Sequence, residues 1–388
     1  MSENQFCEIR KSRKSEIEDI HFAQWVKKIH KYRQTTRLLV ISDSCLELWK
    51  TTAISQSKEF VKTKSFSWFA LTSIDVENKK FKFSFSKDFK PMTVLYDQPA
   101  NLLNALGNLF SNIYLPSEYP RIQGEPNFSQ NNFAIDPTKS GLTRLKAKLL
   151  EKNSETEEIV SLFNTFKNFV YSGMTTFNLG LFENSQYIEY LLDSLSFVPH
   201  ITSAVFRYSK KSKPHWSEYF YLLQNSKYIE CVTTFEDITD DFYNLSQLNQ
   251  SSFSRSIKTL EFGNSDLSDK EIAVIAQVYR NCNVPNIKFI ETTNAMAPFR
   301  KNLTSFTNNS HFKSVTLDKI MIISLYTTLK LLKNVEKIGL TSCGLEISES
   351  IQTICGLNGY LNIKSFDFSG NISRYPLPES TLYLPKNL

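Results

Sequence analysis

The chain has 388 residues, of which 41% are hydrophobic and 22% are charged. This composition is typical of a globular protein that buries a core, and the length suffices for two or three domains. The chain contains no apolar run long enough to span a bilayer, and its first residues, MSENQFCEIRKSRKSEIED, lack the apolar centre of a secretory signal. Its six cysteines are scattered without a C-x-x-C pair, which argues against a disulfide scaffold or a zinc site. We therefore expect a cytoplasmic protein without a metal or other cofactor.

The net charge of +6 comes entirely from the first third of the chain. Residues 1–115 contain 18 Lys or Arg against 12 Asp or Glu, whereas residues 116–388 contain 27 of each. Such an asymmetry indicates a negatively charged partner for the N-terminal part.

Short segments rich in Val, Leu, Phe and Trp follow one another in this basic part, separated by polar or turn-forming residues. They predict strands at 37–42, 45–50, 59–75, 79–86 and 92–96. The period then changes to that of an amphipathic helix, with apolar side chains at Leu102, Leu106, Leu109 and Ile113. Successive short strands closed by one helix predict a pleckstrin-homology-like barrel over residues 15–115.

The next segment, PSEYPRIQGEPNFSQNNFAIDPTKSG, is rich in Pro and Gly and shows no sustained periodicity, which is typical of a linker. Two helical patterns follow it, SGLTRLKAKLLEKN and TEEIVSLFNTFKNFVYSG. We expect residues 116–173 to form a linker and helices that cap the following module.

From residue 174 to residue 388 a strand pattern recurs at a mean spacing of about 27 residues. The strands are expected to start at Phe177, Ala204, Ile229, Leu260, Ile287, Val315, Ile338 and Phe366. This spacing falls in the range of leucine-rich repeats, and a capping box of Ser268 and Glu271 marks one intervening helix. The chain is thus predicted to combine α+β and α/β modules, a barrel followed by a leucine-rich-repeat horseshoe with a parallel sheet and outer helices.

The stretch VEKIGLTSCGLEISESI supports the repeat assignment. Ile338, Leu340, Cys343 and Leu345 match the consensus L-x-L-x-x-N/C-x-L, and so do Leu260, Phe262, Ser265 and Leu267. In the last repeat, Asn371 occupies the position of Cys343. We expect both side chains to point inward and to bind the backbone of the loop.

This order of modules resembles the CARMIL family, which links actin capping protein and myosin-I. The resemblance rests on TRLLVISDSCLELW (36–49), KSFSWFALTSID (64–75) and PSEYPRI (116–122). It implies an atypical pleckstrin fold with affinity for acidic lipid, a repeat horseshoe and a cytoskeletal scaffold role. The capping-protein motif of that family lies in a tail beyond the repeats, and this sequence ends at Leu388.

No catalytic motif stands out: the sequence contains no P-loop, no G-x-G-x-x-G, no H-E-x-x-H and no G-x-S-x-G. The five histidines are far apart and lack metal-ligand spacing. We therefore expect a non-enzymatic protein.

The segments RKSRK (10–14) and VKKIHKYRQTTR (26–37) are candidates for binding an acidic membrane, including phosphoinositides. The expected lipid-binding residues lie where a loop between the first two strands would be: Lys27, Lys28, Lys31, Arg33 and Arg37. The alternative is a solvated loop that only keeps the protein soluble. Trp25 fits either an interfacial or a core position, the core being favoured, and no recognition helix or RNP-like motif indicates nucleic acid.

A second surface is the concave face of the repeats, on which we expect a protein partner. Its candidate residues are Glu261, Lys288, Ile290, Thr316, Asp318, Thr341 and Asp367. We therefore expect an adaptor of the actin cytoskeleton at the inner face of the plasma membrane. The alternative is a leucine-rich-repeat inhibitor or binding protein of a soluble protein, with a purely structural N-terminal domain. If no helix covers the last repeat, its exposed strand edge would favour pairing with a second copy of the chain and thus a homodimer.

Overall fold

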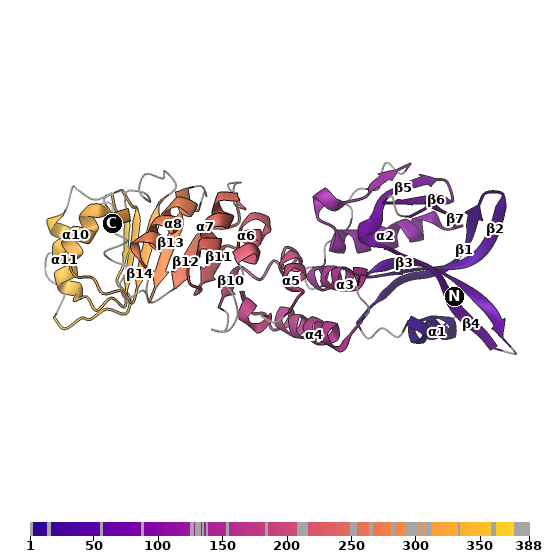
Figure 1. Ribbon diagram of the computed structural model, residues 1–388, viewed down its shortest axis with the longest axis horizontal. Helices are drawn as coiled ribbons and strands as arrows, with labels where there is room; N and C mark the ends of the chain where they lie inside the picture. The colour runs from indigo at the N-terminus through magenta and orange to yellow at the C-terminus, as the bar shows by residue number, and fades with distance from the viewer. Residues whose placement is uncertain are drawn as a thin grey trace. The chain divides into compact units, whose positions relative to one another are not determined.

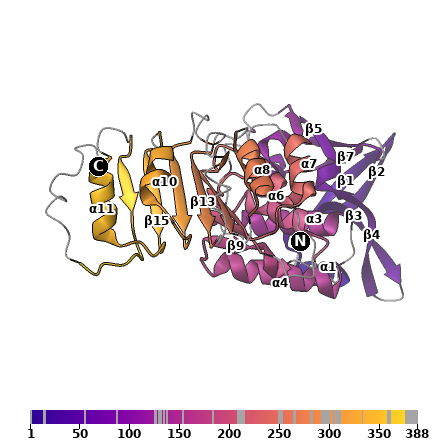
Figure 2. The ribbon, with the colours of Figure 1, turned by 60° about the vertical axis from the view of Figure 1, so that its left-hand side comes forward.

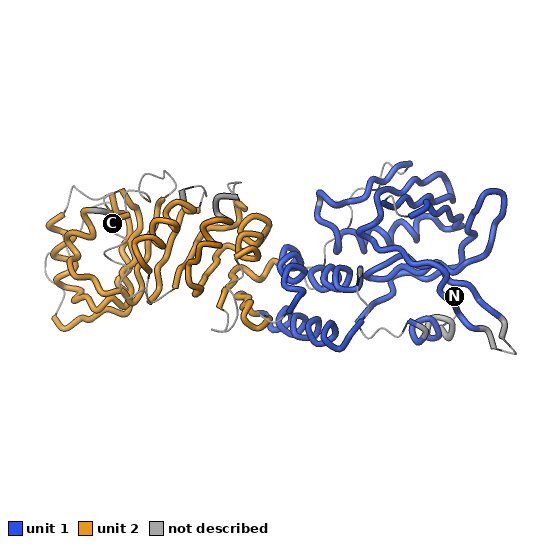
Figure 3. The backbone as a smooth tube through the Cα atoms, viewed as in Figure 1, with its two compact units in different colours: residues 1–173, 185–198 blue, residues 174–184, 199–388 orange. Residues whose placement is uncertain are grey.

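The fold is that of a computed structural model, which divides into two compact units (Figure 3). Unit 1 comprises residues 1–173 and 185–198, and unit 2 comprises residues 174–184 and 199–388. The structure describes residues 3–13, 17–54, 57–86, 89–124, 128, 133, 136, 139–152, 155–182, 185–207, 216–248, 254–263, 267–280, 284–291, 301–302, 306, 312–332, 334–357 and 362–375. None of the helices in these ranges is both long and apolar enough to cross a membrane.

Unit 1 contains an eight-stranded sheet, antiparallel apart from one parallel pair, in the order β4-β3-β2-β1-β7-β6-β5-β8. Its strands are β1 (Ile20–His30), β2 (Arg33–Ser42), β3 (Cys45–Ile54), β4 (Ser57–Ser67), β5 (Leu71–Glu77), β6 (Lys80–Phe85), β7 (Met92–Leu95) and β8 (Arg121–Gln123). The predicted barrel is not seen, because the sheet stays open with β4 and β8 at its edges. β8 lies in the predicted linker and pairs in parallel with β5.

The inner face of this sheet packs against helix α2 (Pro99–Ile113), as Figure 1 shows. Phe81, Phe83 and Phe85 alternate inward on β6, and the four apolar positions predicted for the helix are all buried. Between β4 and β5 the chain forms a short helix, η1 (Trp68–Ala70), where a single long strand was expected. The Trp68 indole donates to the backbone oxygen of Ser42 at 2.8 Å, which closes this corner of the core.

The outer face of strands β1 to β4 carries a smaller apolar cluster that includes Leu38, Val40, Trp49 and Phe60. Helix α1 (Glu3–Arg13) contributes the fully buried Ile9 to this cluster. Neither α1 nor β1 was among the expected elements, since Ile20–His30 alternates only weakly between apolar and polar residues and ends in exposed polar ones.

Among the described residues, unit 1 also contains the 3₁₀ helix η2 (Pro116–Glu118) and the helices α3 (Ser140–Lys152), α4 (Glu157–Tyr171) and α5 (Ile188–Leu195). Helices α3 and α4 are those predicted after the linker. Thr156 caps α4 by accepting from the backbone nitrogen of Ile159 at 3.3 Å. Helices α3 and α4 belong to the same compact unit as the first sheet.

Unit 2 contains an eight-stranded, entirely parallel sheet in sequential order from β9 to β16. The strands are β9 (Thr176–Asn178), β10 (Ser203–Phe206), β11 (Cys231–Thr234), β12 (Thr259–Gly263), β13 (Asn286–Ile290), β14 (Ser314–Asp318), β15 (Lys337–Thr341) and β16 (Ser365–Asp367). Seven of the eight predicted strand starts occupy one register row across this sheet. In the third repeat Val232 takes that row, because the buried Ile229 precedes the strand.

Helices connect these strands, and successive ones lie side by side along the repeats (Figures 1 and 2). They are α6 (Trp216–Asn225), α7 (Asp240–Leu248), α8 (Asp269–Arg280), α10 (Leu325–Leu331) and α11 (Ile347–Gly356), together with the 3₁₀ helix η4 (Leu179–Phe182). The capping box predicted before α8 is confirmed: the Ser268 nitrogen donates to Glu271 at 2.5 Å and the Glu271 nitrogen donates to the Ser268 hydroxyl at 3.4 Å.

The predicted roles of Cys343 and Asn371 are also confirmed. The Cys343 thiol is buried and donates to the backbone oxygen of Leu317 at 3.2 Å. The Asn371 side chain accepts from the nitrogens of Cys343 and Leu345 at 2.9 and 3.1 Å. The Cys343 thiol therefore binds the backbone of β14, and the Asn371 side chain binds the backbone of the turn that follows β15. The consensus residue Ser265 lies outside the described residues.

Candidate functional site

The five basic residues predicted to bind lipid lie on a β-hairpin rather than on a loop. Lys27 and Lys28 are in β1, Arg33 and Arg37 are in β2, and Lys31 begins the two-residue turn between them. A loop was expected here because these strands extend beyond the core and carry polar residues on both faces. The remaining turn residue, Tyr32, is fully exposed at the tip of the hairpin. We call residues 27–37 the basic hairpin.

The pleat of the hairpin separates the five residues onto two faces. Lys28 and Arg37 lie on the face of the buried Val26, whereas Lys27 pairs with Thr36 on the opposite face. Burial lowers the pKa of Lys28, and the nearby charges of Lys64 and Arg37 lower it further. Lys28, Arg37 and Lys64 therefore share the inner face of the sheet, and the charges of Lys64 and Arg37 act on Lys28.

Lys64 was missed by the sequence reasoning. It lies in β4 opposite Leu48, and its ammonium is 5.8 Å from the centre of the Phe66 ring. The alternation in EFVKTKSFSWF marks the face of the strand, but only the pairing of β4 with β3 brings Lys64 near Lys28. The sequence alone therefore predicts the face of the strand on which Lys64 lies, but not that Lys64 lies near Lys28.

The basic hairpin differs from its neighbours in how its charges are compensated. Among the described residues, no carboxylate forms an ion pair with any of its five basic side chains or with Lys64. On β6, by contrast, Lys80 pairs with Glu77 at 3.4 Å and Lys82 pairs with Asp75 at 3.5 Å. The hairpin therefore carries a local excess of positive charge that can attract an anionic partner.

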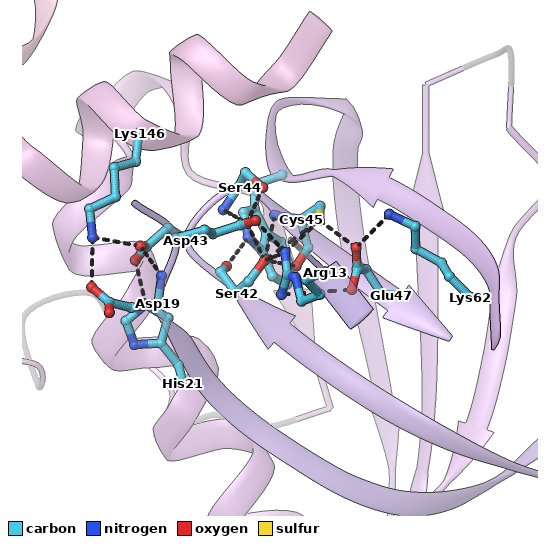
Figure 4. Close-up of polar contacts among 12 residues, drawn as sticks. Arg13, Asp19, His21, Ser42, Asp43, Ser44, Cys45, Glu47, Lys62 and Lys146 are labelled. Carbon is cyan, nitrogen blue, oxygen red and sulfur yellow. Dashed lines mark hydrogen bonds and ion pairs between the residues drawn. The ribbon is translucent and has the colours of Figure 1, made fainter. Parts of the chain in front are cut away.

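A buried polar cluster lies near the opposite end of β1 and β2 (Figure 4). Asp43 accepts from Lys146 of α3 at 2.9 Å and lies 2.6 Å from the Nε2 atom of His21. Burial acts to raise the pKa of Asp43, but the contacts with His21 and Lys146 prevail and lower it. Asp43 is therefore an ionised carboxylate that joins α3 to the first sheet.

The second half of this cluster surrounds Cys45. Glu47 accepts from the Trp49 indole at 2.9 Å and pairs with Lys62 at 3.2 Å, and Arg13 of α1 pairs with Glu18. Burial and the two carboxylates raise the pKa of the Cys45 thiol to about 11. A thiol that stays protonated at neutral pH is a poor nucleophile. The arrangement joins α1 to the sheet and does not activate Cys45.

On the sheet of unit 2, the predicted protein-binding residues occupy two register rows of one face, two residues apart along each strand. Glu261, Lys288, Thr316 and Asp367 lie in one row, and Ile290, Asp318 and Thr341 lie in the other. In strands β13 and β14, these side chains alternate with buried apolar ones such as Phe289 and Leu317.

Neighbouring hydroxyl groups hold the carboxylates of this face in place. The Thr233 hydroxyl donates to Glu261 at 2.7 Å, and the Thr341 hydroxyl donates to Asp318 at 2.6 Å. Glu261 also lies 3.9 Å from the Lys288 ammonium. The face is therefore polar, pre-organised and of mixed charge.

No family model matches the chain, and no curated protein matches it. Among solved structures, the leucine-rich-repeat-containing protein LegL7 from Legionella pneumophila is similar, with a TM-score of 0.37 and 14% identity. The match covers 68% of this chain and 78% of LegL7. Neither the resemblance to the CARMIL family nor the pleckstrin-type barrel gains support from these comparisons.

Proposed function

We propose that this protein is a non-enzymatic adaptor whose basic hairpin docks on an anionic membrane surface and whose parallel sheet binds a protein. The observation that carries the first half of this proposal is the group of six basic side chains without a carboxylate partner among the described residues. Each basic residue near an anionic leaflet contributes roughly 1 kcal/mol of attraction. The exposed ring of Tyr32 at the tip of the hairpin is amphipathic and suits the boundary between headgroups and acyl chains.

The site proposed for the membrane is the inner-face cluster of Lys28, Arg37 and Lys64, with Lys31 and Arg33 extending it toward the tip. Burial is the main cause of the lowered pKa of Lys28, and repulsion by the charges of Lys64 and Arg37 adds to it. An anionic headgroup relieves this repulsion, so the cluster binds an anion more readily than three isolated lysines would. An actin-cytoskeleton role at the plasma membrane rests on the resemblance to the CARMIL family alone.

Sedimentation of the intact chain with vesicles tests the membrane proposal. We expect binding to vesicles that contain phosphatidylserine, none to neutral vesicles, and weaker binding as salt increases. The triple variant Lys28→Gln, Arg37→Gln, Lys64→Gln should bind about a hundredfold more weakly, from roughly 1 kcal/mol for each charge.

The matched control is Lys80→Gln, Lys82→Gln, Lys139→Gln, which removes the same charge from lysines that have carboxylate partners. We expect this variant to bind within about threefold of the unaltered chain, because its lysines are already compensated. If both triple variants lost vesicle affinity equally, the binding would depend on the net charge of the chain and not on the basic hairpin. If the unaltered chain does not sediment at low salt, the alternative of a purely structural N-terminal sheet is favoured.

The exposed face of the parallel sheet is the surface proposed for the protein partner. Its side chains come from five adjacent strands. Hydroxyl contacts hold the carboxylates of Glu261 and Asp318 in place, so these two side chains lose little conformational entropy when a partner binds. The variant Ile290→Glu with Thr316→Arg places charge in the middle of this face. We expect a partner protein that cross-links to the unaltered chain to be absent from the cross-linked products of this variant. The same partner should still cross-link to a control variant in which Lys270 of α8 is substituted.

A further inference from the structure

A row of residues crosses the exposed face of the parallel sheet at the carboxyl ends of its strands. Gly263, Ile290 and Asp318 are the last residues of three successive strands, β12, β13 and β14. Phe235 and Arg207 continue the row, because each of them directly follows its strand, β11 or β10. We call these five residues the terminal row.

Arg207 and Phe235 form a stacked pair at one end of the terminal row. The guanidinium carbon of Arg207 lies 4.1 Å from the centre of the Phe235 ring. The ring in turn covers Gly263, since a Cβ atom at that position would lie 2.4 Å from two of the ring carbons. Glycine is therefore required there for the ring to lie against the sheet. A guanidinium that stacks on a ring still presents its N–H groups to a carboxylate at its edge.

Neither charged end of the terminal row forms an ion pair with a described residue. The exposed Arg207 acts on Glu291, but contact with Lys319 is the main cause of the lowered pKa of that carboxylate. At the other end, Asp318 accepts from the Thr341 hydroxyl at 2.6 Å. Asp318 also acts on Lys319, which Glu291 already binds. Arg207 and Asp318 therefore remain able to bind charges of a partner.

The order of side chains in the terminal row differs from that of the neighbouring row. There, opposite charges compensate each other, because Glu261 lies 3.9 Å from Lys288. In the terminal row, the half-buried Phe235 and Ile290 lie between a cation at one end and a carboxylate at the other. The complementary surface of a partner carries a carboxylate, then apolar side chains, then a cation.

The spacing of the terminal row fits an α-helix. Four strand intervals separate β10 from β14, a distance of about 19 Å at the usual strand spacing. Fourteen residues of an α-helix, close to four turns, rise about 21 Å, and side chains one turn apart share a face. A helix that crosses the strands thus places about one side chain on each of them. An extended chain does not match, since its same-face side chains are about 7 Å apart.

We propose that the terminal row binds an amphipathic helix of the protein partner, with an acidic residue at one end of its apolar stripe and a basic residue about four turns away. The acidic residue contacts Arg207, the apolar ones contact Phe235 and Ile290, and the basic residue contacts Asp318. This inference rests on the proposed protein-binding face, to which it adds the chemistry of the partner and the direction in which the partner lies.

Binding of stapled helical peptides to the intact chain, measured by fluorescence anisotropy, tests this proposal. Three peptides share a leucine stripe and differ only at its two ends, which carry one Glu and one Lys, two Glu, or two Lys. We expect the unaltered chain to bind the Glu/Lys peptide about fivefold more tightly than either of the others, because each mismatched end replaces an attraction with a repulsion.

Charge reversal at either end of the row should switch this preference. Arg207→Glu makes both ends acidic, so the peptide with two Lys should bind best, and Asp318→Lys makes both ends basic, so the peptide with two Glu should bind best. The control Lys270→Glu on α8 changes the net charge as much as Arg207→Glu does and should leave the preference unchanged within about twofold. Gly263→Ala keeps every charge but displaces the Phe235 ring, and it should weaken all three peptides about threefold or more.

The proposal is overturned if no peptide binds saturably at hundreds of micromolar, if the three bind equally well, or if charge reversal does not switch the preference. Any of these results, together with loss of the cross-linked partner in the variant Ile290→Glu with Thr316→Arg, overturns this inference alone. A partner that still cross-links to that variant overturns the protein-binding face itself.

Discussion

The two units bury polar groups in different ways. Unit 1 buries whole charges, such as Arg144, Asp43 and Glu47, and each is held by partners from distant segments of the chain. In unit 2 the buried polar side chains of the described residues are uncharged, and its ion pairs, such as Lys258–Glu230 and Lys319–Glu291, join adjacent repeats at the surface. We expect the loss of one buried charge to destabilise the whole of unit 1, whereas a substitution in unit 2 should destabilise only the repeats next to it.

Arg144 provides the strongest test of this difference. Its guanidinium is fully buried and donates to Asp193 of α5 and Glu118 at 2.7 Å each, as well as to the backbone oxygen of Ile113. Arg144→Ala removes one cation from two carboxylates and should destabilise unit 1 by about 3–5 kcal/mol. Urea unfolding followed by fluorescence measures this loss. A loss below about 1 kcal/mol would show that the carboxylates reach water instead.

Asp43 tests the same contrast through pH. Its pKa in the folded chain is lower than the 3.8 of the free side chain, so its stabilising contribution is complete above that value and is lost as the pH falls through the folded pKa. Asp43→Asn should destabilise unit 1 by about 2–3 kcal/mol at neutral pH, because it weakens hydrogen bonds to a charged group.

Urea unfolding at neutral pH and at a pH below 3.8 measures both effects. The difference between the unaltered chain and the variant should shrink in acid. A difference that stays constant across this range would contradict the assignment of an ionised Asp43.

Asn371 should show the smallest and most local effect. Asn371→Ala removes hydrogen bonds to the nitrogens of Cys343 and Leu345, at a cost of about 1–2 kcal/mol to the terminal repeats. Hydrogen exchange should rise in β15 and β16, while exchange in unit 1 stays unchanged. Cys343→Ser is the milder control, since its hydroxyl can still donate to Leu317. Faster exchange throughout unit 1 would show that the two units unfold together.

Seven of the eight repeat strands could be placed from the sequence because their signal is local. Each strand alternates buried and exposed residues, and each copy packs against a copy of itself about 27 residues away. The exception, Ile229, shows the limit, since it is buried like a strand residue but precedes β11. Strand β1 was not predicted because its polar end pairs within the sheet but contributes few apolar side chains to a core.

The sequence by itself determined the period of unit 2, the inward roles of Cys343 and Asn371, and the concentration of positive charge in the first third of the chain. Only the tertiary structure decided that the first sheet stays open and that Lys27 and Lys28 lie on opposite faces of it. It also decided that Lys64 lies on the same face as Lys28. It also placed Lys146 against Asp19, 127 residues away. The physical reason is that periodicity reports which residues are buried, whereas the convergence of charges depends on strand register and on contacts between segments far apart in the chain.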